Sequence, residues 1–179
     1  MVTAILRKRD SEKSLDGYKE ALKALSALLE KAPTHSDRES QIKIAEIHYH
    51  TGKTLQKICD YKNAILSFSC AIEHLGKAGA DEYFAFPHFH KFICRKELED
   101  SFKMSDCSNV EQLISVAIDM LSLKSGKEEW IARLYHLQEK ISRLCGNHDE
   151  ADWARDEAKD LEKKLEMEKQ STDKLSAGE

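Results

Sequence analysis

The sequence predicts an all-α protein built from antiparallel helical hairpins. Pro and Gly, which interrupt helices, are scarce, with 2 Pro and 7 Gly among 179 residues. Apolar residues make up 41% of the chain and recur at helical spacing, as they do between Tyr18 and Leu29. Charged residues make up another 34%, and helix-capping signals recur along the chain. These observations predict about seven to eight helices in a soluble protein.

Helix-start and helix-stop signals set the order of the elements. Pro33 ends the first helix, Gly76 and Gly146 are expected at helix C-termini, and Pro87 fits a first helical turn. The predicted helices are 16–31, 37–58, 60–75, 87–104, 108–123, 127–145 and 148–169. Two short segments, 41–44 and 83–86, alternate as strands do, so a strand interpretation stays open for them.

Four capping boxes support these boundaries, because a Ser or Asn oxygen and a Glu carboxylate can satisfy the free backbone donors at a helix start. They are Ser36-x-x-Glu39, Ser108-x-x-Glu111, Ser125-x-x-Glu128 and the variant Asn147-x-x-Glu150. Residues 13–169, which contain these helices, are predicted as one helical domain, and residues 1–12 as a short N-terminal helix or arm. Residues 170–179 are small and polar and are predicted as a disordered tail.

The most specific pattern lies between residues 52 and 73. Its small residues allow two helices to cross closely, and one large aromatic residue fills the gap to the next unit. The pattern consists of Gly52, Leu55, Asp60-Tyr61, Ala64-x-x-x-Phe68 and Ala71. It resembles the second half of a tetratricopeptide (TPR) repeat, and residues 45–78 carry the resemblance.

Weaker copies of the pattern extend the resemblance along the chain. The equivalent positions are 21, 64, 113 and 151, at intervals of 43, 49 and 38 residues, whereas the family repeats about every 34 residues. The resemblance therefore implies a divergent TPR-like array over 13–169, stacked as a short right-handed superhelix. A generic helical bundle is the alternative, since any such bundle needs Ala and Phe at helical spacing.

Catalytic, metal and cofactor sites are not expected. The chain has no glycine-rich nucleotide-binding motif, no His-Glu-x-x-His and no nucleophile elbow. His48 and His50, like His88 and His90, are two residues apart, so each pair points to different helix faces. The 5 cysteines are expected as small core residues. A small enzyme or metal protein that uses His and Cys is the remaining alternative.

Charge and hydropathy limit the partners and the compartment. The net charge of −4, with both signs interspersed, does not favour nucleic-acid binding, and no apolar run is long enough to span a membrane. The odd number of cysteines without Cys-x-x-Cys spacing predicts reduced thiols inside the cell. The cytoplasm is the predicted location, with the nucleus as the alternative.

The TPR resemblance implies that the first helix of each hairpin lines a concave groove. The candidate partner-binding residues are then Tyr49, His50, Lys53, Lys57, Arg95, Arg133, His136 and Lys140. They predict an electropositive groove that binds an acidic peptide or helix of another protein. Ordinary solvated helix faces also carry Lys and Arg, and that interpretation stays open.

These inferences predict a non-catalytic protein-interaction module, an adaptor or scaffold subunit that is itself a monomer or a weak homodimer. The alternative is a helical bundle that associates with itself and has a structural or regulatory role.

Overall fold

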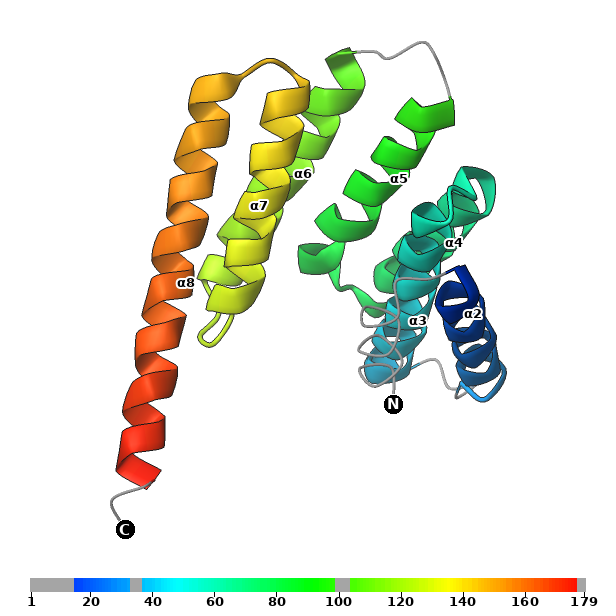
Figure 1. Ribbon diagram of the computed structural model, residues 1–179, viewed down its shortest axis with the longest axis horizontal. Helices are drawn as coiled ribbons and strands as arrows, with labels where there is room; N and C mark the ends of the chain where they lie inside the picture. The colour runs from blue at the N-terminus through cyan, green and yellow to red at the C-terminus, as the bar shows by residue number, and fades with distance from the viewer. Residues whose placement is uncertain (1–14, 33–36, 99–103, 177–179) are drawn as a thin grey trace. The chain divides into compact units, whose positions relative to one another are not determined.

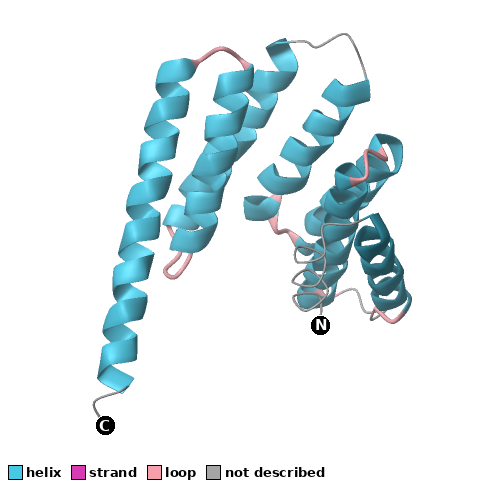
Figure 2. Cartoon of the chain, in the orientation of Figure 1, coloured by secondary structure: helices cyan, strands magenta, loops and turns pink. Residues whose placement is uncertain are grey.

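All regular structure in the described part of the chain is helical. The computed structural model describes residues 15–32, 37–98 and 104–176 (Figures 1 and 2). The elements are α2 (Leu15–Glu30), α3 (Arg38–Lys57), α4 (Tyr61–Ala78), the 3-10 helix η1 (Asp81–Tyr83), α5 (Ala85–Leu98), α6 (Met104–Ser122), α7 (Glu128–Leu144) and α8 (His148–Ser176). The all-α prediction is confirmed, and the strand interpretation of 41–44 and 83–86 is wrong. The arm predicted over 1–12 lies outside the described residues.

The chain divides into two compact units, residues 1–102 and 103–179. In the first unit α3 packs against α2 and α4, and α4 packs against α5. In the second unit α7 packs against both α6 and α8. Within each unit, helices that follow one another in sequence are therefore neighbours in space, as expected for hairpins. The superhelix and the single domain over 13–169 stay predictions.

The close helix crossing predicted at Gly52 is present in the first unit. A Cβ atom at Gly52 would lie 2.7–2.9 Å from three ring carbons of Phe68. At that distance the ring or the backbone would have to shift. Phe68 is fully buried, and its cluster includes Ala64 and Cys94, which are also fully buried. The ring of Phe68 stacks on His90 of α5, with ring centroids 5.6 Å apart. Gly52 thus lets α3 approach α4, and Phe68 links both helices to α5.

In the second unit, alanines allow α8 to lie close to α7. Ala151, Ala154 and Ala158 are all fully buried, and they recur at helical spacing along one face of α8. The core also contains fully buried Leu134 and Ile141 of α7. The predicted tight packing of the alanine-rich end of this helix is therefore confirmed.

Most of the predicted capping boxes are wrong. Asp37 caps α3, since its carboxylate accepts hydrogen bonds from the Ser40 backbone N at 3.0 Å and from Ser40 Oγ at 2.6 Å. The Ser40 bonds also lower the pKa of Asp37. Ser108 lies inside α6, which already begins at Met104, and the N-cap of α7 is Lys127, without a side-chain bond. Ser-x-x-Glu is short enough to occur inside a helix by chance, so it does not fix a boundary alone.

Several helix ends also differ from the prediction. Gly79, with φ of 58°, ends α4 in the left-handed conformation, whereas Gly76 lies within the helix. The helix predicted over 87–104 ends at Leu98, and no Gly or Pro between Pro87 and Gly126 marks that boundary in the sequence.

Helix α8 is longer than predicted. It runs to Ser176, so 170–176 are helical, whereas the sequence prediction placed a disordered tail there. Ser171 Oγ donates to the backbone oxygen of Met167 within the helix, and no Gly or Pro occurs before Gly178 to stop it. In the described residues, no helix is both long and apolar enough to cross a membrane.

A stacked histidine pair joins α3 to α4. The rings of His48 and His74 are 5.6 Å apart at an interplanar angle of 11°. His74 Nδ1 donates to Gln41 Oε1 at 2.8 Å, because the amide oxygen can only accept. Burial lowers the pKa of both histidines; the charge of His74 lowers that of His48 further, while Glu73 opposes this shift.

This pair is expected to make the protein less stable as the pH falls below about 6.5, the ordinary pKa of histidine. Below that pH the two histidines of the unfolded chain become protonated. In the folded protein His48 and His74 stay neutral until the pH reaches their lowered pKa values. The stabilisation is therefore complete above about 6.5 and is lost progressively below it. Urea unfolding of the protein and of His48→Gln at pH 7.5 and 5.5 measures the effect, and His48→Gln should show the shallower pH dependence. His148→Gln, at an exposed site, is the control, and an unchanged slope in His48→Gln would contradict the assignment.

Candidate protein-interaction surfaces

Two of the predicted partner-binding residues lie together on α3, next to α5. The Lys53 ammonium lies 5.6 Å from the centroid of the Tyr49 ring, a cation–π contact one helical turn apart. Tyr49 also meets His90 of α5 edge-on, with ring centroids 5.7 Å apart. His90 Nδ1 in turn donates to Gln56 Oε1 of α3 at 3.0 Å. We name this partly exposed group of Tyr49, Lys53, Gln56 and His90 the α3–α5 surface.

The first unit contains three more of the predicted partner-binding residues, His50, Lys57 and Arg95. His50 packs against the Tyr49 ring at 5.2 Å and lies 4.0 Å from Glu46. Lys57 is exposed in the last turn of α3. Arg95 lies elsewhere on α5. Burial lowers the pKa of His88 and of Lys91 there, and the positive charge of Arg95 lowers both further. Arg95 therefore lies near Lys91 and His88 on α5, apart from the α3–α5 surface.

In the second unit, the predicted cations on α7 are largely paired with carboxylates. Arg133 donates to Glu129 at 2.6 Å and lies 5.0 Å from the Trp130 ring. His136 Nε2 lies 3.0 Å from Glu162, and its Nδ1 lies 3.8 Å from Glu139. Lys140 is exposed. This face of α7 is therefore not a simple electropositive strip.

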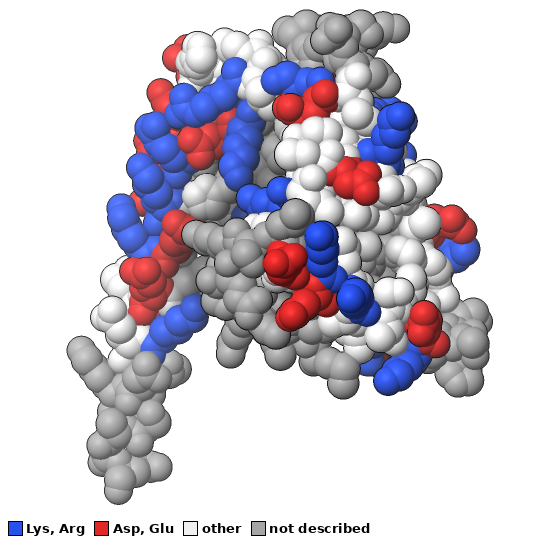
Figure 3. All heavy atoms as spheres, turned by 45° about the vertical axis from the view of Figure 1, so that its right-hand side comes forward, with Lys and Arg blue, Asp and Glu red and all other residues white. Residues whose placement is uncertain are grey.

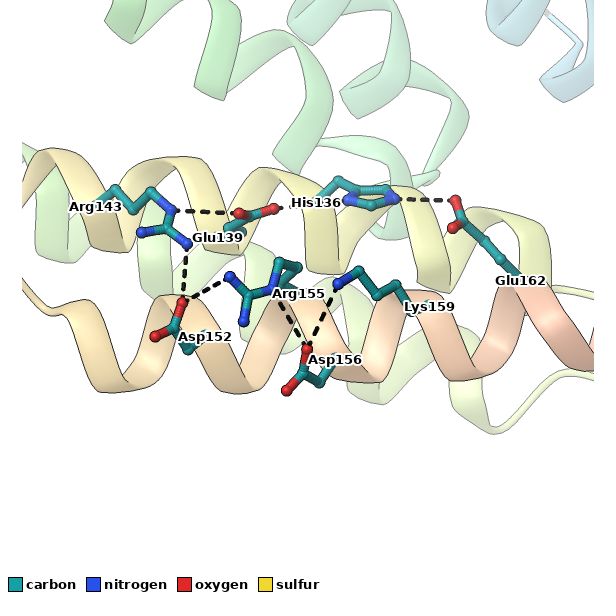
Figure 4. Close-up of polar contacts among 8 residues, drawn as sticks. All are labelled: His136, Glu139, Arg143, Asp152, Arg155, Asp156, Lys159 and Glu162. Carbon is teal, nitrogen blue, oxygen red and sulfur yellow. Dashed lines mark hydrogen bonds and ion pairs between the residues drawn. The ribbon is translucent and has the colours of Figure 1, made fainter.

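A network of ion pairs covers this face of the α7–α8 hairpin (Figure 4). Arg143 bridges the two helices, with 3.3 Å to Glu139 and 2.9 Å to Asp152. Arg155 continues the network along α8 to Asp152 and Asp156. Figure 3 likewise shows basic and acidic atoms next to one another along α8. Charge on this side is thus neutralised within the unit.

A polar pocket of about 350 Å³ lies in the second unit, at the end where α7 joins α8. Side chains from all three helices line it, and none is apolar or basic: Glu111, Gln112, Ser115, Gln138, Ser142, Asn147 and Glu150. Ser142 is fully buried, and its Oγ donates to Glu111 Oε1 at 3.2 Å. Gln138 Nε2 donates to Glu150 Oε1 at 2.6 Å. Two carboxylates are thus held in place at the pocket by neutral donors.

An aromatic pair joins α7 to α8 one helical turn before Gln138. Tyr135 precedes Gln138 on α7, and its ring meets that of Trp153 of α8 edge-on at 5.5 Å. Trp153 is 47% exposed. Burial raises the pKa of Tyr135, and the negative charges of Glu157 and Asp119 raise it further. The surroundings of α7 are therefore negative here as well.

The sequence prediction missed the polar pocket because it assigned its two glutamates to helix caps. Glu111 and Glu150 point to α7 and receive hydrogen bonds from Ser142 and Gln138. A usable signal was present in α7, where Gln138 and Ser142 lie one turn apart beside the buried Ile141. Polar residues four apart next to a core position indicate a polar contact between helices.

The pKa values of two of the five cysteines are strongly raised. Burial raises the pKa of the Cys94 thiol to about 11, and the nearby Glu97 adds to the shift. Burial also raises the pKa of Cys145 to about 12, helped by its contact with Cys107. Both thiols therefore stay protonated at neutral pH, the form that is a poor nucleophile and a poor metal ligand. No group of three His, Cys, Asp or Glu side chains among the described residues is placed to hold a metal ion.

Comparison with known proteins leaves the family of this chain open. No protein-family model matches the sequence, and no curated protein matches it significantly.

Proposed function

We propose that this protein is a non-catalytic protein-interaction module, a TPR-like adaptor or scaffold subunit that binds a peptide or helix of another protein. The observation that carries the proposal is the α3–α5 surface. The TPR resemblance assigns the groove to the first helix of each hairpin, and α3 and α5 are in contact in the first unit. Their shared surface presents Tyr49 and Lys53, with His90 and Gln56 beside them.

The chemistry of this surface suits an acidic partner. A lysine over an aromatic ring, flanked by an exposed Lys57, offers positive charge next to apolar area. Aromatic residues supply much of the binding energy at protein interfaces, and charge complementarity selects the partner. An acidic peptide or helix would place carboxylates near Lys53 and Lys57 and apolar side chains against Tyr49.

Lys53→Glu is expected to weaken partner binding by roughly tenfold or more, about 1.4 kcal/mol, because it reverses the charge at the centre of the α3–α5 surface. The experiment isolates partners with the tagged full chain and then measures affinity for the identified, purified partner by calorimetry. Lys62→Glu makes the same charge change at an exposed site on α4 and is the control.

Two outcomes would contradict the proposal. Equal affinities of the two variants would remove the α3–α5 surface from the binding site. Light scattering across a concentration series that shows a stable oligomer disrupted by Lys53→Glu would instead favour the self-associating bundle.

A further inference from the structure

Two cysteines of the second unit are in contact across the α6–α7 hairpin. Cys107 lies in the first turn of α6, and Cys145 directly follows the last residue of α7. The Cys145 thiol donates a hydrogen bond to the Cys107 sulfur, and both cysteines are free thiols. The α3–α5 surface lies in the first unit, so this contact is a separate feature of the second.

The packing of α6 against α7 places the two cysteines opposite each other. A short loop, 123–127, joins the helices, which therefore run antiparallel. Ser142 Oγ of α7 donates to Glu111 Oε1 of α6 at 3.2 Å, and this bond fixes their register. Cys107 lies one turn before Glu111, and Cys145 lies one turn after Ser142. In an antiparallel pair these opposite steps lead to the same level, so the contact follows from the helix packing itself.

The two thiols differ in their access to solvent. Cys107 is almost fully buried, whereas Cys145 is partly exposed. A dissolved oxidant can therefore reach Cys145 first. A disulfide needs Cα atoms about 4.4–6.8 Å apart, and small adjustments are easiest at a helix end. Cys145 is at such an end, followed by Gly146 in the left-handed conformation with φ of 78°.

We propose that Cys107 and Cys145 are a reversible disulfide site, which links the start of α6 to the end of α7 in the presence of a peroxide. Hydrogen peroxide oxidises the Cys145 thiol to a sulfenic acid and releases one water. The Cys107 sulfur then attacks the Cys145 sulfur, so the S–S bond forms and the S–O bond breaks with loss of a second water. Two thiols thus give up two protons and two electrons, which reduce one peroxide to two waters. A thiol reductant restores both cysteines by exchange.

The ionisation of Cys145 sets the pace of this reaction. Burial raises the pKa of this thiol, and the hydrogen bond with Cys107 raises it further, to about 12. The thiolate is the nucleophilic form, and little of it is present at neutral pH. The link therefore forms under sustained oxidation and not during a brief exposure.

The disulfide would close residues 107–145 into a loop. A cross-link of this kind stabilises a fold largely by restricting the unfolded chain, and more so for longer loops. Oxidation should therefore make the second unit more resistant to unfolding. This site does not depend on the function proposed above, since it lies outside the α3–α5 surface.

The test treats the full-length protein with hydrogen peroxide, blocks the remaining thiols with N-ethylmaleimide in denaturant, and digests the chain with trypsin. Mass spectrometry should find peptide 104–124 joined to peptide 144–155, each of which contains one cysteine. Both tryptophans, Trp130 and Trp153, lie in the second unit, so their fluorescence follows its unfolding. Oxidation should raise the urea midpoint by at least about 1 M. Dithiothreitol should separate the peptides and restore the midpoint, which distinguishes the disulfide from oxidised methionine.

Variants locate the effect. Cys145→Ser removes the accessible sulfur and should abolish both the joined peptides and the rise in the urea midpoint. Cys70→Ser, at a partly exposed cysteine of α4, is the matched control and should keep both. Three results would each overturn the assignment: an equal rise in Cys145→Ser, a disulfide that joins Cys145 to Cys59 or Cys94 in place of Cys107, or reduced Cys107 and Cys145 after the exposed Cys59 has been oxidised.

Discussion

Phe68→Ala is expected to lower the free energy of unfolding by about 3–5 kcal/mol. Phe68 of α4 is fully buried, and its ring contacts groups from both α3 and α5. It lies against Gly52 of α3, stacks on His90 of α5 at 5.6 Å and lies 6.0 Å from the Tyr49 ring. Removing the ring leaves a cavity at the point where α3, α4 and α5 meet, and their backbones cannot close it without moving.

Chemical unfolding followed by circular dichroism measures this loss. The control is Leu66→Ala, two residues away on α4, where the side chain is 63% exposed. Because that side chain leaves little apolar surface buried, its removal should change stability by no more than about 0.5 kcal/mol. Similar losses for Phe68→Ala and Leu66→Ala would show that the Phe68 ring does not hold these helices together.

Gly52→Ala is expected to destabilise the protein by up to about 2 kcal/mol. The added methyl group would lie 2.7–2.9 Å from the Phe68 ring, which is fully buried and cannot swing into solvent. Overpacking of this kind is destabilising by about 1–3 kcal/mol. The intrinsic preference of helices for Ala over Gly, about 1 kcal/mol, offsets only part of it.

Gly76→Ala is the matched control for this prediction. Gly76 also lies within a helix, but a Cβ there would meet only Phe84 Cζ, at an ordinary 3.7 Å. That substitution should stabilise the protein by about 0.5–1 kcal/mol, because only the helix preference remains. Phe68→Leu combined with Gly52→Ala should show a smaller penalty for the alanine than the native background does. If Gly52→Ala stabilises as Gly76→Ala does, α3 and α4 do not cross closely at this point.

The fold class and the packing at Gly52 were both predictable from the sequence because each depends on local chemistry. The spacing of apolar residues sets the helices. A glycine followed by a small residue twelve positions later, Ala64, and a large aromatic residue sixteen positions later, Phe68, predicts a close helix crossing. The alanine face of α8 was predictable for the same reason, since Ala151, Ala154 and Ala158 repeat at helical spacing. Such patterns of small residues indicate where two helix backbones approach closely.

The capping residues and the polar pocket were less accessible because their roles depend on contacts distant in sequence. Glu111 accepts from Ser142, 31 residues away, and Glu150 accepts from Gln138, 12 residues away. A glutamate near a helix start can accept a hydrogen bond from the backbone N–H of the N-cap residue or from a side chain of a neighbouring helix. The local sequence is the same in both cases. His136 of α7 raised the same problem, since its partner Glu162 on α8 becomes a neighbour only in the folded unit. Glu129, the partner of Arg133, lies only four residues away in the sequence.

The length of α8 has a consequence for how that helix holds together. Its 29 residues extend about 44 Å, whereas the 17 residues of α7 extend about 26 Å. Among the side chains described up to Ser171, Leu165 is the last that is partly buried, and those from Glu166 to Ser171 are all exposed. The first part of α8 therefore unfolds only when the α7–α8 packing is lost. The stretch from Glu166 to Ser171 buries no side chain and depends on local helix preference, so it can fray and re-form without disturbing the core.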